Sequence, residues 1–403
     1  MIDNINIKTK TNLLKLLKYN ISLNEELSKL THEQWDEIIK IAKRHHVKEY
    51  LYYNLKKNKL LNLLDDCQIN RLKTSFKKRT ISNLSKVAEL KKVIKNFEKE
   101  NIPIIALKGL HLIQEVYPHI ALRYLRDLDI LIPKNKSEQA VNILNKLEYT
   151  CKKKLTKSDF NFEYYHHIQP MHKKNSILEL HGELSDNKKV DIDKYWKDAN
   201  FKNYCGFLSI EDLIIHLCIH ISYSDLFKND LRHYLDIYII IEEFKNKINW
   251  ELLKKKIELN KCEKGTYIVF NIVKDLFDIK IPLLENNTNK INQTILNNSL
   301  EFLWLYDKKS KDYAFYRFYD NTIEKDKNFI VNVISRIFIN KAKLSHYYSI
   351  EQNNKFIYFY YFRRFYDLVK THSLKVVKMN TNNDKMSFLN KTKQVHDFLI
   401  KGN

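Results

Sequence analysis

Residues 108–133 read KGLHLIQEVYPHIALRYLRDLDILIP, and the last part of this stretch decides the fold. Within it, RDLDILI at residues 126–132 alternates acidic with apolar side chains and is followed by Pro133. Successive side chains of a strand point to opposite faces, so Asp127 and Asp129 are predicted to lie side by side on one face. Their mutual repulsion destabilises the strand unless a cation offsets it. The pair therefore predicts a site for a divalent metal ion.

A possible phosphate-binding corner precedes this strand. The apolar run at residues 102–106 ends near Lys108 and Gly109, and glycine at a strand-to-helix corner lets the backbone approach a phosphate. Arg123 and Arg126 stand just before the acids, and guanidinium groups suit phosphate oxygens, although one of them could simply balance the acids. We interpret Lys108, Gly109, Arg123 and Arg126 as nucleotide-binding residues.

This order of strand, glycine corner, helix and D-x-D strand resembles the polymerase-beta-type nucleotidyltransferase superfamily. That superfamily usually has Gly-Gly or Gly-Ser at the corner, whereas Leu110 follows Gly109 here, and the stretch before the first acid is longer than usual. These departures, with Lys108 and the two arginines, resemble a bacterial family of uncharacterised nucleotidyltransferases (NTP_transf_5-like).

Four further stretches resemble the same family. They are THEQWDEIIKIAKRHHVKEYLYYNL at 31–55, LELH at 178–181, SIEDLIIHLCIH at 209–220 with LRHYLDI at 231–237, and YFRRF at 361–365. In the family, the strand after the D-x-D carries an acid two residues before a histidine, and that acid is more often Asp. Glu179 therefore keeps the charge but lengthens the reach.

The resemblance implies metal-dependent nucleotidyl transfer. Asp127, Asp129 and Glu179 would be the metal-binding and catalytic residues, with Glu179 as third ligand or as general base, and the cofactor would be Mg²⁺ or Mn²⁺. An NMP, AMP from ATP in our reading, would pass from an NTP to a hydroxyl of a small molecule, sugar or peptide, releasing pyrophosphate. The alternative is a catalytically silent nucleotide- or RNA-binding module on the same fold. Nucleic acid is thus a conceivable partner, but not the one we expect.

Five further residues are candidates for a substrate cleft: His181, His216, His220, Arg232 and Asp236. His181 shares a strand face with Glu179 and could orient that acid, touch substrate, or be a structural histidine. Arg232 and Asp236 are four residues apart, which fits either a helix-surface ion pair or a substrate contact.

Two of these candidates also belong to a histidine pattern on one predicted helix. Asp212, His216 and His220 are spaced four apart, which is a metal-ligand geometry in principle. Because no further ligand on a neighbouring element is evident, we interpret them as a polar face lining the cleft, with a zinc site as the alternative.

Composition favours anionic partners without identifying one. The chain has 70 Lys plus Arg against 48 Asp plus Glu, a formal net charge of +22. It is also rich in Lys, Asn and Ile with only five Gly and five Pro, a bias that AT-rich coding can impose. The five scattered cysteines suggest neither disulfides nor a zinc site. With no signal-like or membrane-spanning apolar run, we expect a cytoplasmic protein without a transmembrane segment.

Helical periodicity surrounds the predicted strands. Thr31 with Gln34 forms a capping box, residues 84–97 show a second amphipathic helix, and Ser137 opens a third after the D-x-D strand. We predict an α+β fold, in which a small mixed-sheet core at residues 84–198 is flanked by helical regions at 1–83 and 199–378. Residues 379–403, rich in Asn, Lys and Thr, are predicted to form a flexible tail.

The segment KFIYFYYFRRFYDLVK at residues 355–370 places aromatic residues around Arg363 and Arg364. Such a segment can stack bases or lie in a membrane interface. A helix that is aromatic on nearly every side is normally buried, with its arginines reaching outward. We therefore predict a structural helix that closes the C-terminal helical domain.

Overall fold

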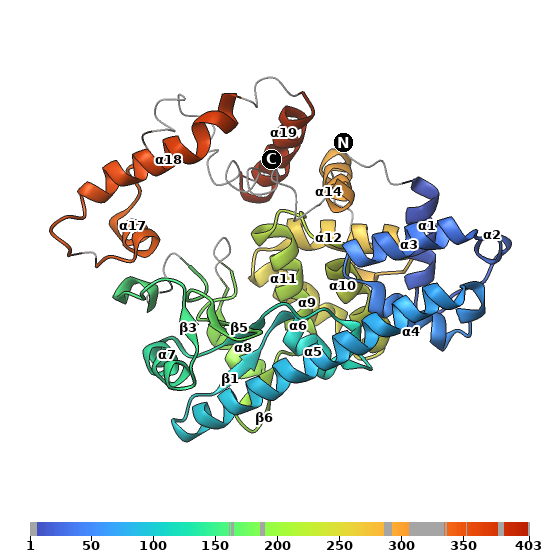
Figure 1. The fold of residues 1–403 in the computed structure, drawn as a ribbon, viewed down its shortest axis with the longest axis horizontal. Helices are drawn as coiled ribbons and strands as arrows, with labels where there is room; N and C mark the ends of the chain where they lie inside the picture. Colours follow the sequence, from blue (N-terminus) through green and yellow to red (C-terminus); the bar gives the residue numbers. More distant parts are fainter. Residues whose placement is uncertain are drawn as a thin grey trace.

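A mixed β-sheet forms the centre of the molecule, and helices from both ends of the chain flank it (Figure 1). The computed structural model describes residues 6–160, 162, 165–185, 190–285, 292–305, 334, 337–351, 353–377 and 383–401. The predicted α+β class, with a mixed-sheet core between two helical regions, is confirmed.

The N-terminal region is helical up to the first strand. Its helices are α1 (Ile7–Leu17), α2 (Glu25–Ser28), α3 (His32–Arg44), α4 (Lys48–Lys57) and α5 (Asp66–Lys99). The predicted capping box of Thr31 and Gln34 is present at the start of α3. The 34-residue helix α5 runs without a break past residue 83, where we placed a domain boundary, so the helical region and the core share it.

Seven strands form one sheet in the order β3-β4-β5-β2-β1-β7-β6. They are β1 (Ile104–Ala106), β2 (Leu128–Leu131), β3 (Thr150–Cys151), β4 (Met171–Lys173), β5 (Ser176–His181), β6 (Asn200–Lys202) and β7 (Cys205–Phe207). β2 pairs in parallel with β5 and antiparallel with β1, whereas β1 pairs in parallel with β7. Strands β6 and β7 lie beyond residue 199, so the sheet continues past the start that we predicted for the C-terminal helical region.

Three helices connect the strands: α6 (Lys108–Glu115), α7 (Ser137–Lys146) and α8 (Ile192–Asp198). The helix predicted from Ser137 is α7, and it buries Ala140, Val141 and Leu144 as its periodicity indicates. The predicted corner after β1 is the start of α6. The local order of strand, helix and strand in the core therefore follows the sequence pattern.

The two faces of the sheet belong to different apolar clusters. Leu128 and Ile130 pack in a cluster with residues of α5 and α7. Leu131 belongs to the cluster that also holds residues of the N-terminal helices and of the helices after the sheet. Side chains two residues apart share a face, so Asp129 faces the same side as Leu131, toward the helical regions.

The helices after the sheet are α9 (Ile210–Ile219), α10 (Leu231–Phe244), α11 (Trp250–Leu259), α12 (Glu263–Phe277), α13 (Pro282–Glu285) and α14 (Gln293–Leu305). A π-helical turn, His220–Ser224, follows α9 directly. The buried faces of α9, α10 and α12 share one apolar cluster with α1, α3 and α4. Within the described ranges, no helix combines the length and the apolar character needed to cross a bilayer.

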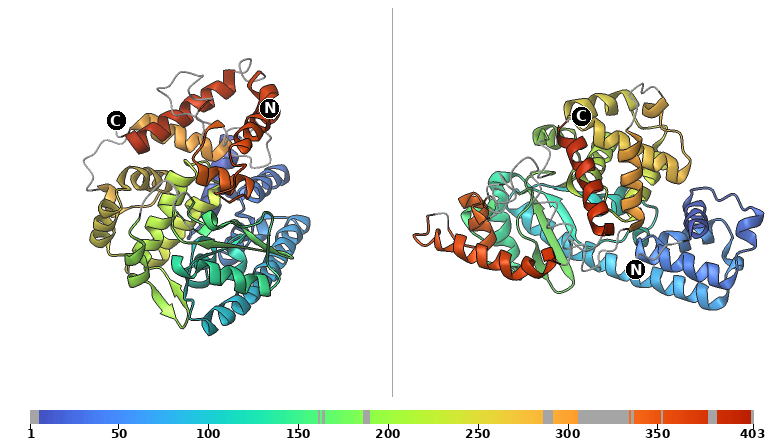
Figure 2. Two further views of the ribbon diagram at one scale, coloured as in Figure 1. Left: turned by 90° about the vertical axis from the view of Figure 1, so that its left-hand side faces the viewer. Right: turned by 90° about the horizontal axis from the view of Figure 1, so that it is seen from above.

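The end of the chain differs from two predictions. The described helices there are α17 (Lys341–Tyr348), α18 (Phe359–Val377) and α19 (Asn383–Lys401). α19 lies along α14 (Figure 2), buries Val395 and Leu399, and joins Lys391 to Glu301 at 2.5 Å. Within the predicted flexible tail, residues 383–401 thus form a helix whose apolar residues contact α14, and residues 379–382 and 402–403 lie outside the described residues.

The aromatic segment before that tail is also placed differently. α18 packs on α17 at the edge of the molecule instead of closing the C-terminal helical domain (Figures 1 and 2). Only part of its aromatic surface is covered: Tyr360 and Tyr361 pack against a small buried cluster that includes Leu344, whereas Phe359 and Phe362 are exposed. The prediction that this segment closes the C-terminal helical domain is therefore wrong, because its covered side packs on α17.

Candidate active site

The centre of the candidate site is a cluster of two acids and a histidine on neighbouring strands. Because β2 and β5 pair in parallel, Asp129 lies directly opposite Glu179 and Leu131 opposite His181. His181 Nε2 is 2.9 Å from Asp129 Oδ1 and 3.7 Å from Glu179 Oε2. Among the described residues, these three form the one group whose ligand atoms lie close enough together to hold a metal ion.

Lys108 completes the cluster from the helix side. It is the first residue of α6 and takes a left-handed backbone conformation, with φ of 43°. Its Nζ lies 2.7 Å from Asp129 Oδ1. Burial opposes the charge on Lys108, but the carboxylates of Asp129 and Glu179 outweigh it and raise the pKa of the ammonium group.

Gly109 has a packing role, and its role in nucleotide binding stays a prediction. A side chain there would approach Leu125 Cδ1 to 3.2 Å and Arg123 Nη1 to 3.7 Å. Glycine thus lets α6 lie close to the segment that leads into β2. At this corner the left-handed conformation belongs to Lys108, not to the glycine.

The ammonium group of Lys108 balances the charge of Asp129 but not that of Glu179 as well. Burial and the neighbouring Asp129 raise the pKa of Glu179 to about 8. Burial likewise opposes the charge on Asp129, yet Lys108 and the hydrogen bond with His181 hold the pKa of Asp129 well below its ordinary value. One lysine is enough to ionise Asp129 but leaves Glu179 favouring its protonated form.

Asp127 stands beside the cluster, one residue before β2. It is half-buried, and burial and the charge on Asp129 raise its pKa, against the opposing effects of Lys108 and Arg126. Its carboxylate is not part of the group formed by Asp129, Glu179 and His181. Arg126 is exposed at this edge of the site.

Arg123 has a buried partner far away in the sequence. Its Nε donates to both carboxylate oxygens of Asp236 at 2.8 Å, and Tyr117 Oη donates to Asp236 Oδ1 at 2.8 Å. All these groups are buried. Arg123 and Asp236 therefore form a buried ion pair with each other. We had predicted that Arg123 binds nucleotide and that Asp236 lines a cleft.

Arg232 also differs from its sequence-based interpretation. Its Nη1 donates to the carbonyl oxygen of Tyr124 at 3.0 Å, and its Nε lies 3.2 Å from Asp230 Oδ1. The helix-surface ion pair between Arg232 and Asp236 is therefore wrong, because both residues are buried and each has another partner. Arg232 acts electrostatically on Asp127, so it borders the site.

Several histidines surround the acids. His216 on α9 is fully buried, neither ring nitrogen has a hydrogen-bond partner among the described residues, and burial with nearby Lys108 lowers its pKa to about 3. Burial and Lys108 lower the pKa of His220 as well. Asp212 binds Lys256 Nζ at 2.7 Å and does not join the histidines in a metal-binding group, which argues against the zinc alternative.

Sequence reasoning missed two histidines of this region. The rings of His166 and His167 lie 5.2 and 5.3 Å from the ring of His181, and His167 forms a β-bridge with His181. The His-His pair in the sequence was the available signal, but nothing local indicates that the loop returns to the end of β5.

A match to a family model covers residues 31–278, which is more than half of the chain. The model describes an uncharacterised nucleotidyltransferase. The chain belongs to this nucleotidyltransferase family. Neither the curated proteins nor the solved structures that were searched gave a match.

The nucleotidyltransferase match includes every residue of the candidate site, from Lys108 to Asp236. As a member of this family the protein is a transferase, and its family implies an NTP substrate and a divalent metal ion. Two carboxylates and an imidazole fit such an ion, and a cation would oppose both the burial and the Asp129 charge that raise the pKa of Glu179.

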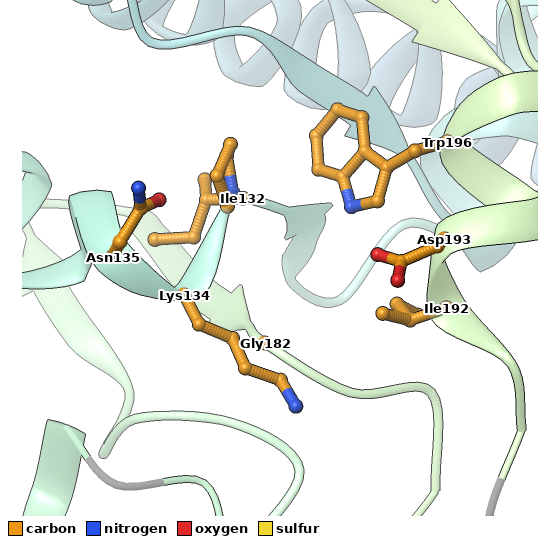
Figure 3. A pocket seen from close by; sticks show the side chains of 8 residues that line it. Ile132, Lys134, Asn135, Gly182, Ile192, Asp193 and Trp196 are labelled. Atoms are coloured by element: carbon orange, nitrogen blue, oxygen red, sulfur yellow. The ribbon is translucent and has the colours of Figure 1, made fainter.

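A pocket of the nucleotidyltransferase, about 430 Å³ in volume, lies at the ends of the two central strands. Ile132 follows β2 and Gly182 follows β5, and the Ile132 amide donates to the His181 carbonyl oxygen at 2.9 Å. Figure 3 shows Trp196 and Asp193 of α8 on one side of this pocket and Asn135 and Lys134 on the other. The pocket therefore begins one residue beyond His181.

Proposed function

We propose that this nucleotidyltransferase transfers AMP from ATP to a hydroxyl group of a small molecule, sugar or peptide and releases pyrophosphate. The observation that carries the proposal is the register that sets Asp129 opposite Glu179, with His181 and Lys108 on the same carboxylate oxygen. Lys108 pairs with the buried Asp129, and the half-buried Glu179 beside it leaves negative charge that a metal ion would offset.

Asp129, Glu179 and Asp127 would hold Mg²⁺ or Mn²⁺, with His181 beside them as a nitrogen donor. Such an ion neutralises phosphate charge and lowers the pKa of a bound hydroxyl. Asp127 lies outside the tight cluster, at the edge where Arg126 is exposed, and that edge suits the triphosphate. The metal role of Asp127 depends on its carboxylate turning toward the ion.

Lys108 would hold the β- and γ-phosphates. Its ammonium group now pairs with Asp129, and its position at the first residue of α6 puts it next to the helix amides that attract anions. Once a divalent ion offsets Asp129, Lys108 is free to turn to the nucleotide. Arg126, exposed next to Asp127 at the edge of the site, would be a second cation for the triphosphate.

Glu179 is the group we assign to the acceptor proton. A carboxyl group accepts a proton only when it is ionised, and a metal ion beside Glu179 would oppose the burial and the Asp129 charge that raise its pKa to about 8. The acceptor hydroxyl would transfer its proton to Glu179 as its oxygen attacks the α-phosphorus in line with the departing pyrophosphate. The new bond joins the acceptor oxygen to phosphorus, and the bond to the bridging oxygen breaks.

The pocket beside Trp196 is where we place the body of the acceptor. The flat indole face with the carboxylate of Asp193 and the amide of Asn135 suits a hydroxylated ring, because aromatic planes stack on such rings and the polar groups bond their hydroxyls. An NTP donor and the five free cysteines fit a cytoplasmic location.

Incubation of the protein with each α-labelled NTP, Mg²⁺ or Mn²⁺ and a host extract tests the proposal. We expect label from ATP to appear in an acceptor with an equal amount of pyrophosphate. Asp129→Asn should lose the transfer, and Glu138→Gln, a change at an exposed acid of α7, should keep it. Tight binding of nucleotide or RNA with no pyrophosphate release would instead support the silent binding module.

A further inference from the structure

Six aromatic side chains near the start of α18 form an exposed surface, which we call the aromatic face. They are Phe356, Tyr358, Phe359, Phe362, Phe365 and Tyr366, and each is 50–74 % exposed. Soluble proteins seldom expose so many large apolar side chains together, and such patches mark interaction sites.

The opposite side of the same segment is fixed to the protein. Ile357 is buried in a small cluster with Leu344 of α17, and Tyr360 and Tyr361 pack against that cluster. Tyr361 Oη also donates to the carbonyl oxygen of Ile339 at 2.8 Å. Packing on one side thus sets the direction of the aromatic face. Tyr358 borders α17, because its hydroxyl accepts a hydrogen bond from Lys341 Nζ at 2.9 Å, and the four phenylalanines and Tyr366 are the exposed remainder.

Positive charge accompanies the aromatic face. Residues 355–370 contain four Lys or Arg and one acid, Asp367, a net charge of 4 − 1 = +3. That acid accepts a hydrogen bond from Tyr348 Oη at 2.9 Å. Arg363 and Arg364 lie over the rings of Tyr348 and Tyr347 of α17, so they flank the packed side of α18, and Arg363 stays exposed together with Lys370.

We propose that the aromatic face docks this protein on an anionic lipid surface, with α18 parallel to the membrane plane. Phenylalanine rings that project from a helix can enter the boundary between head groups and acyl chains, and neighbouring Lys and Arg attract anionic head groups. Tyr366 carries a hydroxyl that would remain at the level of the head groups.

Single-stranded nucleic acid fits the aromatic face less well than lipid does. Base stacking needs ring faces presented beside a cationic groove. Four of the six side chains are phenylalanines spread along a convex helix, an arrangement that favours insertion over stacking. The proposal does not depend on the transferase reaction, because it concerns an element outside the family match at residues 31–278.

Co-sedimentation of the full-length protein with vesicles tests the proposal. We expect binding to phosphatidylcholine vesicles that contain phosphatidylglycerol, little binding to phosphatidylcholine alone, and weaker binding as salt is raised. The triple variant Phe359→Ser/Phe362→Ser/Phe365→Ser should lower the partition coefficient by roughly tenfold or more. The matched control Ile81→Ser/Leu84→Ser, on the exposed side of α5, should bind like the unmodified protein.

A second variant keeps the proposal testable if the first variant misfolds. Arg363→Glu/Lys370→Glu reverses two exposed charges and should remove the preference for anionic vesicles, while circular dichroism and the melting temperature stay unchanged. The proposal is overturned if the unmodified protein does not bind vesicles, or if both variants bind vesicles as well as the unmodified protein does. It is also overturned if the aromatic variant loses only RNA binding or self-association.

Discussion

Lys108 Nζ and Asp129 Oδ1 lie 2.7 Å apart, and the same carboxylate oxygen is 2.9 Å from His181 Nε2. Both Asp129 and His181 are buried, so this carboxylate depends on Lys108 for its charge balance. The pKa of Glu179 is instead raised, by burial and by the Asp129 charge, because one ammonium group cannot balance two neighbouring carboxylates. These contacts lead to separate predictions for each member of the cluster.

Lys108→Met should destabilise the metal-free protein by about 3–5 kcal/mol, since it leaves the buried Asp129 carboxylate without its cation. Transfer should be lost as well. Urea unfolding measures the first effect and pyrophosphate release the second. Lys99→Met removes an exposed lysine from the end of α5 and should change neither. A Lys108→Met protein as stable as the unmodified one would show that the ion pair is not formed.

Asp127→Asn and Asp129→Asn should both abolish transfer yet change stability in opposite directions. Repulsion alone predicts that removing either acid helps the metal-free protein, and Asp127, whose pKa is raised, should follow this rule. Asp129→Asn removes the carboxylate that pairs with Lys108, and the cost of this loss outweighs the relief of repulsion between the acids. Melting temperatures should therefore rise or stay level for Asp127→Asn and fall for Asp129→Asn. Full activity in Asp129→Asn would contradict the proposed function.

Glu179→Gln should change how the stability of the metal-free protein depends on pH. The Glu179 pKa is raised from 4.5 to about 8, so between these values the folded state holds a proton that the unfolded state has released. Stability of the unmodified protein therefore falls as pH rises through this window, with a limit of about 1.4 kcal/mol per pH unit for one proton.

In Glu179→Gln this loss is absent, so the variant should gain stability over the unmodified protein as pH goes from about 5 to 8. Histidine titration is common to both proteins and cancels in the difference. Urea unfolding across the pH range measures it. A difference that is constant with pH would show that Glu179 ionises normally.

Arg123→Met should lower the free energy of unfolding without a specific effect on nucleotide binding. Its guanidinium group is buried against Asp236, and breaking such a pair costs about 3–5 kcal/mol. Asp236→Asn should cost a similar amount, and the double variant less than the sum of the two. Arg126→Met is the matched change at an exposed arginine: it should raise the KM for the NTP and leave the melting temperature in place.

Mn²⁺ should raise the melting temperature more than Mg²⁺ does, because His181 adds a nitrogen to the donor set and imidazole favours transition metals over Mg²⁺. Burial and Lys108 hold the pKa of His181 well below its ordinary value, so the ring is neutral at pH 7. His181→Asn should reduce the shift with Mn²⁺ and leave most of the shift with Mg²⁺. Equal losses with both ions would make His181 a positioning residue for Asp129 instead of a ligand.

Local periodicity in the sequence determined part of the architecture. Alternation in RDLDILI predicted one strand, capping and amphipathic spacing predicted the helices at Thr31 and Ser137, and the resemblance predicted the strand at LELH and the family. These features depend on residues a few positions apart, where backbone geometry fixes which side chains share a face.

Tertiary packing decided the partners of the charged groups. The sequence placed Arg123 next to the acids and Asp236 near Arg232, but the structure joins Arg123 to Asp236 across 113 residues and leaves Lys108 to neutralise Asp129. Similarly, the pattern of residues 355–370 could not tell a buried aromatic helix from an exposed one. Each outcome depends on which distant elements desolvate a side chain, and desolvation is a property of the packed chain that no short stretch of sequence contains.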